Sequence, residues 1–460
     1  MPPPILNWLV LQVILELPVL FLSGAVCLFS FAARADLWRT AYYPGWEQSS
    51  MPASNIDFTA LTHIIHFSVI PNTDGTLNSS DNGVTTANST DIVTRAHAAG
   101  KPVLICVGGA SSESDFQAAT SNAALAVFVS SLTNFMATRG YDGVDLDWEP
   151  LTAADTGQFT NLVNSLRSAL NSFPQHKLLT VAAGAYPPYG DPPTVEYTMF
   201  ATLQNQFDQI NIMTYDLSGP YEGWVTWFNS PIYDGGYRFP STGGLVPSVD
   251  GAVANFIANG VLPAKLGVGI AFYGYIWTGR VTQPRQSWTN APTVSTPSYA
   301  TIMTGYYQSN LYHWDTSAQA AYLSITNANP ANDMFISYDD QRTCQSKISY
   351  ARNRDLGGVM IWELAQDHQK GQPDSLLLAV KQALAAPGQI TIQNIGEDIE
   401  LSFTGLSLGS YRVEWTGDLT SNVWNTLAVT NVTGPGGVLQ LADPAAASQP
   451  QRFYRVQTPP

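Results

Sequence analysis

Short apolar β runs alternate with helical patterns from residue 36 to about residue 386, and this alternation constrains the fold more than any other feature of the sequence. Runs of this kind, bounded by polar and turn-forming residues, are typical of strands. The strand candidates are Thr40–Tyr43, His63–Val69, Val103–Val107, Gly143–Trp148, Leu178–Ala183, Gln209–Thr214, Leu266–Ile270 and Gly358–Trp362. Strands that alternate with helices predict a parallel sheet covered by helices.

The connections between several of these strands carry amphipathic helical patterns. Their apolar positions, three and four residues apart, are Leu125, Phe128, Val129, Leu132 and Met136, then Phe159, Leu162, Val163, Leu166, Leu170 and Phe173, and finally Leu376, Leu377, Val380 and Leu384. Eight strands with interleaved helices over about 350 residues predict an α/β fold, the (β/α)8 or TIM barrel with insertions. An open doubly wound sheet is the alternative, but no G-x-G-x-x-G follows the first strand.

Two long connections interrupt the regular pattern, residues 217–250 and 274–339. Both are rich in Trp, Tyr, Gly and Pro, which favours substrate-binding loops over disorder. The second connection looks short for a complete additional α+β module on the rim of the barrel. We therefore expect a shallow, open cleft, which would favour random internal cleavage of a polymer.

The pattern changes after Pro387 to short segments that mostly alternate apolar with polar residues. These segments are Ile399–Phe403, Tyr411–Trp415, Val438–Leu441 and Phe453–Val456, separated by Gly, Asn, Asp and Pro. We therefore expect a small all-β, sandwich-like accessory domain over residues 387–460. Trp415 and Trp424 belong either to its core, which we favour, or to a carbohydrate-binding face.

Residues 1–35 are predicted to be a signal peptide that precedes a catalytic domain over residues 36–386. No charge occurs from Leu17 to Ala33, and the run ends on Ala33-Arg34-Ala35, an A-x-A pattern that suits signal peptidase. The first eight residues, however, carry no Lys or Arg, so a membrane anchor within residues 5–33 is the alternative. We expect the protein to be secreted, without a stable membrane partner, and to act as a monomer.

The charge of the chain excludes some classes of ligand. The formal net charge is −15, and only 12% of the residues are Asp, Glu, Lys or Arg. Nucleic acid as a partner is not expected, because phosphate binding needs clustered basic residues. A surface rich in neutral polar groups suits hydroxyl-rich ligands such as sugars. The six His residues show no H-E-x-x-H spacing, so we expect no metal site and no cofactor.

The most informative segment for function runs from Asp142 to Glu149, with the sequence DGVDLDWE. Side chains alternate between the faces of a strand, so Asp145, Asp147 and Glu149 share one face, about 6.6 Å apart along it. Inside a barrel these acids would lie one after another along the strand, each nearer to the C-terminal mouth than the one before. Carboxylates that converge in an apolar interior cannot all ionise cheaply, so at least one pKa should be raised, as a general acid requires. Glu149, the outermost, is the candidate acid.

This segment closely resembles the D-G-x-D-x-D-x-E signature of glycoside hydrolase family 18, the retaining chitinases and their relatives. Further stretches over about residues 38–385 are similar to the same family: Tyr42-Tyr43-Pro44-Gly45-Trp46, Leu61-Thr62-His63-Ile64, Met213-Thr214-Tyr215-Asp216, Lys265 to Tyr273, and Gly358-Val359-Met360-Ile361-Trp362-Glu363. One departure concerns the third strand, which usually ends S-x-G-G in the family and here reads Cys106-Val107-Gly108-Gly109. A thiol is a weaker hydrogen-bonding partner than a hydroxyl.

The resemblance implies substrate-assisted hydrolysis, an exception to the use of a carboxylate nucleophile. Glu149 would protonate the glycosidic oxygen, and the sugar's own 2-acetamido oxygen would attack to form an oxazolinium ion. Asp147 would orient the acetamido N–H, with Asp145 and Asp142 holding Asp147, and Tyr215 would contact the acetamido oxygen. The implied substrate-binding residues are Asp216, Met213, Trp362, Tyr43, Gly108, Gly109 and Phe272.

The resemblance therefore implies an endo-acting chitinase as the leading function. The alternatives are an endo-β-N-acetylglucosaminidase acting on N-glycans or peptidoglycan and an inactive chitin-binding lectin. Retention of the full set of acids argues against the lectin. Further sugar rings could stack on aromatic side chains outside the motifs, or these side chains could belong to the core. They are Trp46, Tyr186, Trp224, Trp227 and Tyr273.

Overall fold

The computed structural model describes residues 37–384, except 189–190, 193, 369–371 and 373, and residues 391–457, except 396–397, 405–409, 419, 422, 432–437 and 444–451. The expected signal peptide, the alternative anchor and the expected boundary at residue 387 lie outside the described residues. None of the helices in the described ranges is both long and apolar enough to cross a bilayer.

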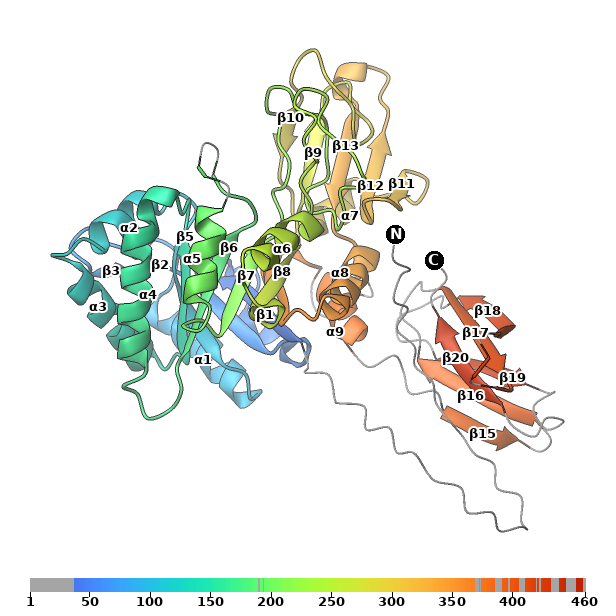
Figure 1. The fold of residues 1–460 in the computed structure, drawn as a ribbon, viewed down its shortest axis with the longest axis horizontal. Coiled ribbons are helices and arrows are strands. Elements are labelled where there is room, and N and C mark those ends of the chain that lie inside the picture. Colours follow the sequence, from blue (N-terminus) through green and yellow to red (C-terminus); the bar gives the residue numbers. More distant parts are fainter. Residues whose placement is uncertain are drawn as a thin grey trace, which may run out of the picture. The chain divides into compact units, whose positions relative to one another are not determined.

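Eight parallel strands form a closed barrel, as the sequence predicts (Figure 1). They are β1 (Trp38–Pro44), β2 (His63–Pro71), β4 (Val103–Gly109), β5 (Gly143–Trp148), β6 (Leu178–Gly184), β7 (Gln209–Met213), β8 (Leu266–Ala271) and β14 (Gly358–Trp362). The barrel closes because β1 pairs in parallel with both β14 and β2. A short strand, β3 (Leu77–Asn78), pairs antiparallel with β2.

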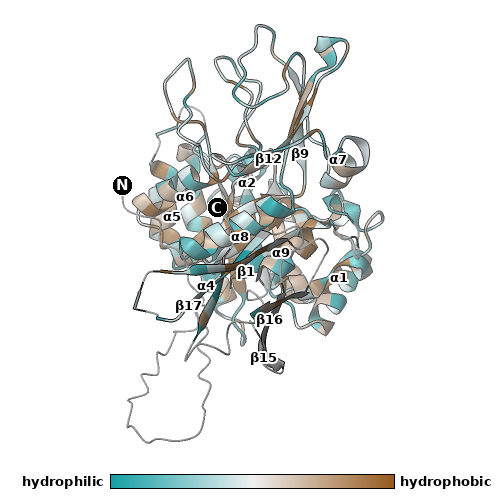
Figure 2. Ribbon diagram, turned by 90° about the vertical axis from the view of Figure 1, so that its right-hand side faces the viewer, coloured by the Kyte–Doolittle hydropathy of each residue, from teal (hydrophilic) through white to brown (hydrophobic). Residues whose placement is uncertain are grey.

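Helices cover the outside of the barrel, and the three predicted from periodicity are confirmed. The covering helices are α1 (Thr86–Ala98), α2 (Glu113–Ala119), α3 (Leu125–Arg139), α4 (Thr156–Leu170), α5 (Val195–Leu203), α6 (Val249–Ala258), α8 (Gln341–Asn353) and α9 (Leu376–Leu384). Helix α4 shows why they form, because its apolar positions from Phe159 to Leu170 are fully buried. Figure 2 shows the polar residues that α1 and α8 carry beside their apolar ones.

Short single turns of 3-10 helix complete the connections. They are Gly45–Glu47, Ala53–Asn55, Phe58–Ala60, Ala153–Asp155, Pro263–Lys265, Pro330–Asn332 and Leu364–Gln366.

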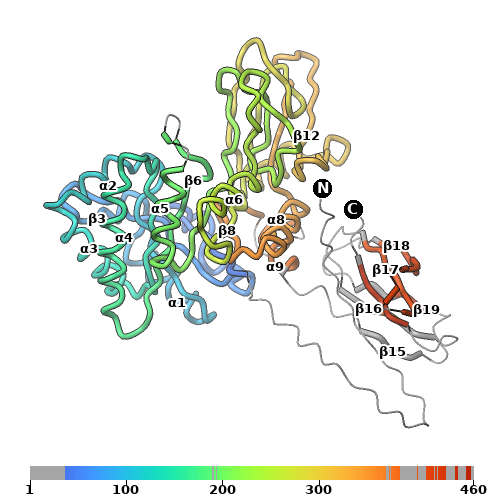
Figure 3. Tube along the Cα trace, viewed as in Figure 1, coloured from blue at the N-terminus to red at the C-terminus, as the bar shows by residue number. Residues whose placement is uncertain are grey.

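The connection between β8 and α8 forms a complete α+β module, so the expectation of a barrel without one is wrong. It contains β9 (Gly274–Thr278), β10 (Thr293–Ser295), α7 (Tyr299–Gly305), β11 (Tyr312–Asp315), β12 (Ala320–Ile325) and β13 (Met334–Tyr338). These strands form one antiparallel sheet in the order β10-β9-β13-β12-β11. Figure 3 shows the module as one excursion of the chain, coloured from yellow-green to light orange.

Half of the core of this module comes from another part of the sequence. Trp277 of β9 and Phe335 of β13 pack with Trp227 and Phe228, which lie in the loop between β7 and α6. All four side chains are fully buried. Trp227 is therefore a core residue and not a sugar platform. Residues 274–339 look short for a complete module when taken alone, because half of its core is supplied by a distant loop.

The C-terminal residues form a separate compact unit with two antiparallel sheets. One contains β15 (Thr391–Ile395), β16 (Asp398–Thr404) and β19 (Val438–Asp443), and the other β17 (Ser410–Thr416), β18 (Asn425–Asn431) and β20 (Phe453–Gln457). Leu401 of the first sheet packs with Val413 and Tyr454 of the second, which makes the unit a sandwich. Trp415 packs partly on this core, and the guanidinium of Arg452 lies 3.7 Å from its ring centre.

Candidate active site

Strand β5 carries the predicted row of acids into the interior of the barrel. Asp145 is fully buried, Asp147 is 3% exposed, and Glu149 follows the end of the strand and is partly exposed. The intervening residues face outward, where the Trp148 ring stacks on Phe116 of α2 at 4.7 Å. The strict alternation of a strand thus separates a polar inner face from an apolar outer one.

Asp145 is held by donors from three other strands of the barrel, β1, β4 and β6. The Tyr42 hydroxyl donates to its Oδ2 at 2.9 Å, and Thr180 Oγ1 donates to its Oδ1 at 2.5 Å. The Cys106 thiol, which faces it across the β4–β5 pair, also hydrogen-bonds to this carboxylate. Burial raises the pKa of Asp145 to about 6, and the three hydrogen bonds limit this rise because they stabilise the ionised form.

Asp147 and Glu149 form a coupled pair of acids at the mouth of the barrel. Burial, followed by the charges of Glu149 and Asp145, raises the pKa of Asp147 well above its usual value. Burial also raises the pKa of Glu149, and the hydrogen bond from Asp147 opposes that rise. The pair therefore retains a proton between its two carboxyl groups at pH values where ordinary carboxylates have lost theirs. Asp147 Oδ1 has no hydrogen-bond partner among the described residues.

The loop after β7 brings Tyr215 and Asp216 to the same cleft. The Tyr215 hydroxyl lies 3.6 Å from Met360 Sδ, and burial raises the pKa of this phenol well above its usual value. The Asp216 carboxylate accepts hydrogen bonds from the hydroxyls of Tyr273 at 2.6 Å and Tyr275 at 2.8 Å. Asp216 has a φ of +56°, an unusual conformation for a residue with a side chain.

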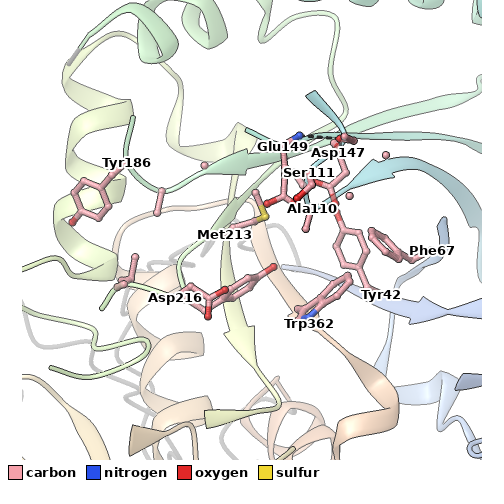
Figure 4. Close-up of a pocket in the computed structure, with 18 of the residues that line it drawn as sticks. Tyr42, Phe67, Ala110, Ser111, Asp147, Glu149, Tyr186, Met213, Asp216 and Trp362 are labelled. Carbon is pink, nitrogen blue, oxygen red and sulfur yellow. Dashed lines mark hydrogen bonds between the residues drawn. The ribbon is translucent and has the colours of Figure 1, made fainter. Parts of the chain in front are cut away.

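These residues line a cleft of about 1330 Å³ with aromatic side chains in its floor and walls (Figure 4). Trp362 contacts Tyr42 with ring centres 5.5 Å apart and Phe67 at 4.8 Å. Gly108 and Gly109, which also line the cleft, allow close packing at the end of β4, because a Cβ at these positions would lie 2.1 Å from Asp147 O and 2.6 Å from Phe67 Cζ. Both glycines also have positive φ. Met213 and, of the outer aromatic residues, Trp46, Tyr186 and Trp224 line the cleft too.

Besides the fully buried Asp145, three of the expected site residues do not line this cleft. Asp142 accepts hydrogen bonds from Val103 N at 2.9 Å and contacts His97 Nε2 at 2.8 Å, below the start of β5. The Tyr43 hydroxyl donates to Met51 O, and Phe272 is fully buried. The reason is the alternation of side chains, which turns these positions away from the inner face of the barrel. The structure corrects the expectation and brings their neighbours Tyr42 and Tyr273 to the site.

Two buried groups behind the loop after β7 were missed by sequence reasoning. Asn229 accepts a hydrogen bond from Asp216 N at 2.8 Å through its Oδ1, and its own N–H donates to Ser337 Oγ of β13 at 2.9 Å. Lys347 of α8 is fully buried and pairs with Asp339 at 2.5 Å. Asn229 gives no signal in the sequence. Lys347 does, because it interrupts the apolar stripe of Cys344, Ile348 and Ala351.

A closed (β/α)8 barrel whose mouth holds a proton-sharing pair of carboxyl groups above an aromatic floor defines a glycoside hydrolase. Comparison with known proteins gives the particular family. The chain belongs to the glycosyl hydrolases family 18, whose model matches residues 39–367. It is a glycoside hydrolase, as the sequence motifs predict.

Relatives and solved structures agree with this assignment. The class V chitinase of Arabidopsis thaliana is 30% identical over 370 residues, 76% of this chain and 90% of the relative. Chitinase A1 of Niallia circulans is 30% identical over 297 residues, but the match covers only 41% of its length and 58% of this chain. The chitinase ChiW of Paenibacillus has a TM-score of 0.64 and 26% identity, covering 76% of this chain and 33% of ChiW.

Proposed function

We propose that the protein hydrolyses β-1,4 linkages of N-acetylglucosamine polymers, with chitin as the natural substrate, and retains the configuration at the anomeric carbon. The observation that carries the proposal is the coupled pair Asp147–Glu149, placed in the cleft with Tyr215 and Trp362. The names of the relatives, which are chitinases from bacteria, fungi and plants, support chitin over other glycans.

In this mechanism Glu149 protonates the glycosidic oxygen with the proton that it shares with Asp147. The carbonyl oxygen of the sugar's 2-acetamido group attacks the anomeric carbon, and an oxazolinium ion forms. The unpartnered Asp147 Oδ1 accepts the acetamido N–H and stabilises the positive charge that develops, while Asp145 orients Asp147. Glu149, now ionised, takes a proton from the water that opens the ring.

The remaining residues of the cleft bind the sugar. The Tyr215 hydroxyl donates to the acetamido oxygen, and its raised pKa keeps it protonated as the donor. Trp362 forms the apolar floor beneath the central sugar, and Met213 with Asp216 lies beside it. Further sugar rings stack on exposed aromatic side chains at the rim, of which Trp46 is 45% exposed. Because sugar rings bind on both sides of the central sugar, the enzyme cleaves linkages inside the polymer chain.

The test compares four substrates with the purified protein: chitohexaose, chitin, a glycoprotein with N-glycans, and peptidoglycan. Products are identified by mass spectrometry. The anomeric configuration of their new reducing ends is followed by NMR in the first minutes. We expect chitin oligomers of mixed length with β reducing ends. Release from the glycoprotein or from peptidoglycan, with none from chitohexaose, would instead establish an endo-β-N-acetylglucosaminidase of different specificity.

The pH dependence follows from the coupled pair. Activity requires the shared proton, so kcat/KM is expected to fall as pH rises through the upper pKa of the pair. In Asp147→Asn the negative neighbour is gone, so Glu149 loses its proton more easily, and the alkaline limb should move to lower pH by about one unit or more. The measurement is a pH profile of kcat/KM on a fluorogenic chitotrioside. Asp142→Asn, outside the cleft, should leave the limb in place, and an unmoved limb in Asp147→Asn would refute the coupling.

Export is a second part of the proposal. The uncharged run from Leu17 to Ala33 and the A-x-A pattern that ends it support cleavage and secretion. The N-terminal sequence of the protein recovered outside the cell tests this assignment against the membrane anchor.

A further inference from the structure

The walls of the cleft carry negative charge without any basic group. Among the lining residues that the structure describes, five are carboxylic acids and none is Lys, Arg or His. The proposed chemistry uses Asp147 and Glu149, and Asp216 lies beside the central sugar. Asp115 and Glu222 have no part in it. A neutral polymer such as fully acetylated chitin offers these two acids hydrogen-bond donors but no positive charge to pair with.

Asp115 and Glu222 belong to different walls of the cleft. Asp115 lies in the first turn of α2, after β4, and is partly buried. Glu222 lies in the loop after β7, is exposed, and follows Tyr221, which is 59% exposed. Strands β4 and β7 are three positions apart in the barrel. Within the described part of the chain, neither carboxylate takes part in an ion pair or a side-chain hydrogen bond.

The centre of the cleft requires a hydrogen-bond donor from the ligand instead of a positive charge. Asp147 lines the cleft and is 3% exposed, and its buried Oδ1 has no hydrogen-bond partner among the residues that the structure describes. A buried acceptor of this kind needs a donor from the ligand. The acetamido N–H supplies it, and only an acetylated sugar carries the carbonyl oxygen that attacks. The central position therefore requires an acetylated sugar, whereas the positions beside Asp115 and Glu222 do not.

Charge then decides which glycans the cleft favours. A cleft lined by charges of one sign raises the local concentration of ligands of the opposite sign, and repels ligands of the same sign. Glucosamine units carry an ammonium group in place of the acetamide. Peptidoglycan and sialylated glycans carry carboxylates, which the acidic walls disfavour.

We propose that the cleft prefers partly de-N-acetylated chitin, a polycation, over neutral and carboxylated glycans, with Asp115 and Glu222 binding the ammonium groups of glucosamine units on either side of an acetylated central sugar. This inference rests on the proposed function and specifies its substrate class. The two unpaired carboxylates determine specificity and take no part in bond cleavage.

The test uses one set of oligomers in two forms, partly de-N-acetylated and then chemically re-N-acetylated to the neutral form. The chain lengths are the same but the number of acetylated units differs, so the ratio of kcat/KM per acetylated unit on the two forms measures the preference for positive charge. We expect a ratio of roughly fivefold for the wild-type protein at low ionic strength, and a ratio near one at high salt, since exposed charge pairs are weak and screened.

The variant Asp115→Asn/Glu222→Gln should reduce this ratio to near one and leave kcat/KM on the neutral oligomers within about twofold. The matched control is Asp81→Asn/Glu113→Gln, which removes the same number of charges from residues that do not line the cleft. It should keep the preference.

A preference that survives in the Asp115→Asn/Glu222→Gln variant, or that the control loses equally, would overturn the inference, because the effect would then come from the overall charge of the protein. Equal rates of the wild type on both forms would also overturn it while leaving the proposed function intact. The proposed function itself fails only if neither form is cleaved.

Discussion

Glu149→Gln is expected to lower kcat on chitohexaose by about 10³-fold. The amide keeps the size of the side chain and its place at the mouth of the barrel, but it has no proton of sufficient acidity for the leaving oxygen. Binding should change little, because the aromatic floor around Trp362 is intact, so the loss should appear in kcat and not in KM. Steady-state kinetics on chitohexaose, with binding of the intact oligomer measured by calorimetry, checks both parts.

The matched control for this variant is Glu363→Gln. Glu363 is also a buried glutamic acid, and burial raises its pKa to about 7, but it does not line the cleft. Its Oε2 accepts a hydrogen bond from Ala365 N, which an amide oxygen can replace. Activity of this control should stay within a few-fold of the wild type. Equal product release by Glu149→Gln and the wild type would show that Glu149 is not the general acid.

Lys347→Met is expected to cost about 3–5 kcal/mol of the stability of the barrel, because it leaves the Asp339 carboxylate buried without its cation. Lys347 is fully buried, and Nζ contacts Asp339 Oδ2, Gly269 O at 3.1 Å and Ser230 Oγ. Ser230 in turn donates to Thr214 O, next to Tyr215. The ammonium group of Lys347 therefore connects helix α8 and the end of the α+β module with the strands that carry the site.

Unfolding in urea, followed by intrinsic fluorescence, measures this loss. Lys381→Met is the control, because Lys381 forms an exposed pair with Asp57 at 2.9 Å and should contribute less than about 1 kcal/mol. Without Lys347 the buried Asp339 favours its neutral form even more strongly, so the destabilisation should shrink as pH falls. If Lys347→Met unfolds no earlier than Lys381→Met, the buried pair does not support the fold.

The barrel could be predicted from the sequence because its strands are short, apolar and regularly spaced. The observed bounds of β1 and β2 differ from the predicted ones by at most two residues at either end. The module between β8 and α8 could not be predicted, because pattern reasoning examines one segment at a time. Its core is completed by Trp227 and Phe228, which come from the loop after β7.

The position of the acids could be predicted for a similar reason. Alternation along a single strand places Asp145, Asp147 and Glu149 on one face without any knowledge of the rest of the fold. A motif shows which segment reaches the site but not which of two adjacent residues faces it, and so Tyr43 was expected where Tyr42 lies. A contact between residues 13 positions apart in an irregular loop, such as that of Asn229 with Asp216, leaves no trace in local patterns.

The way in which the α+β module joins the barrel has a consequence for engineering. Its first and last strand residues, Gly274 and Tyr338, are paired neighbours in the β9–β13 ladder. The chain therefore leaves and re-enters the barrel at almost the same point, so a shorter hairpin or a foreign module can replace the whole stretch at one splice, provided that it covers Trp227 and Phe228 of the loop after β7 as the native module does. This part of the molecule can thus be exchanged as a unit if Asp339 and its pair with Lys347 are also kept.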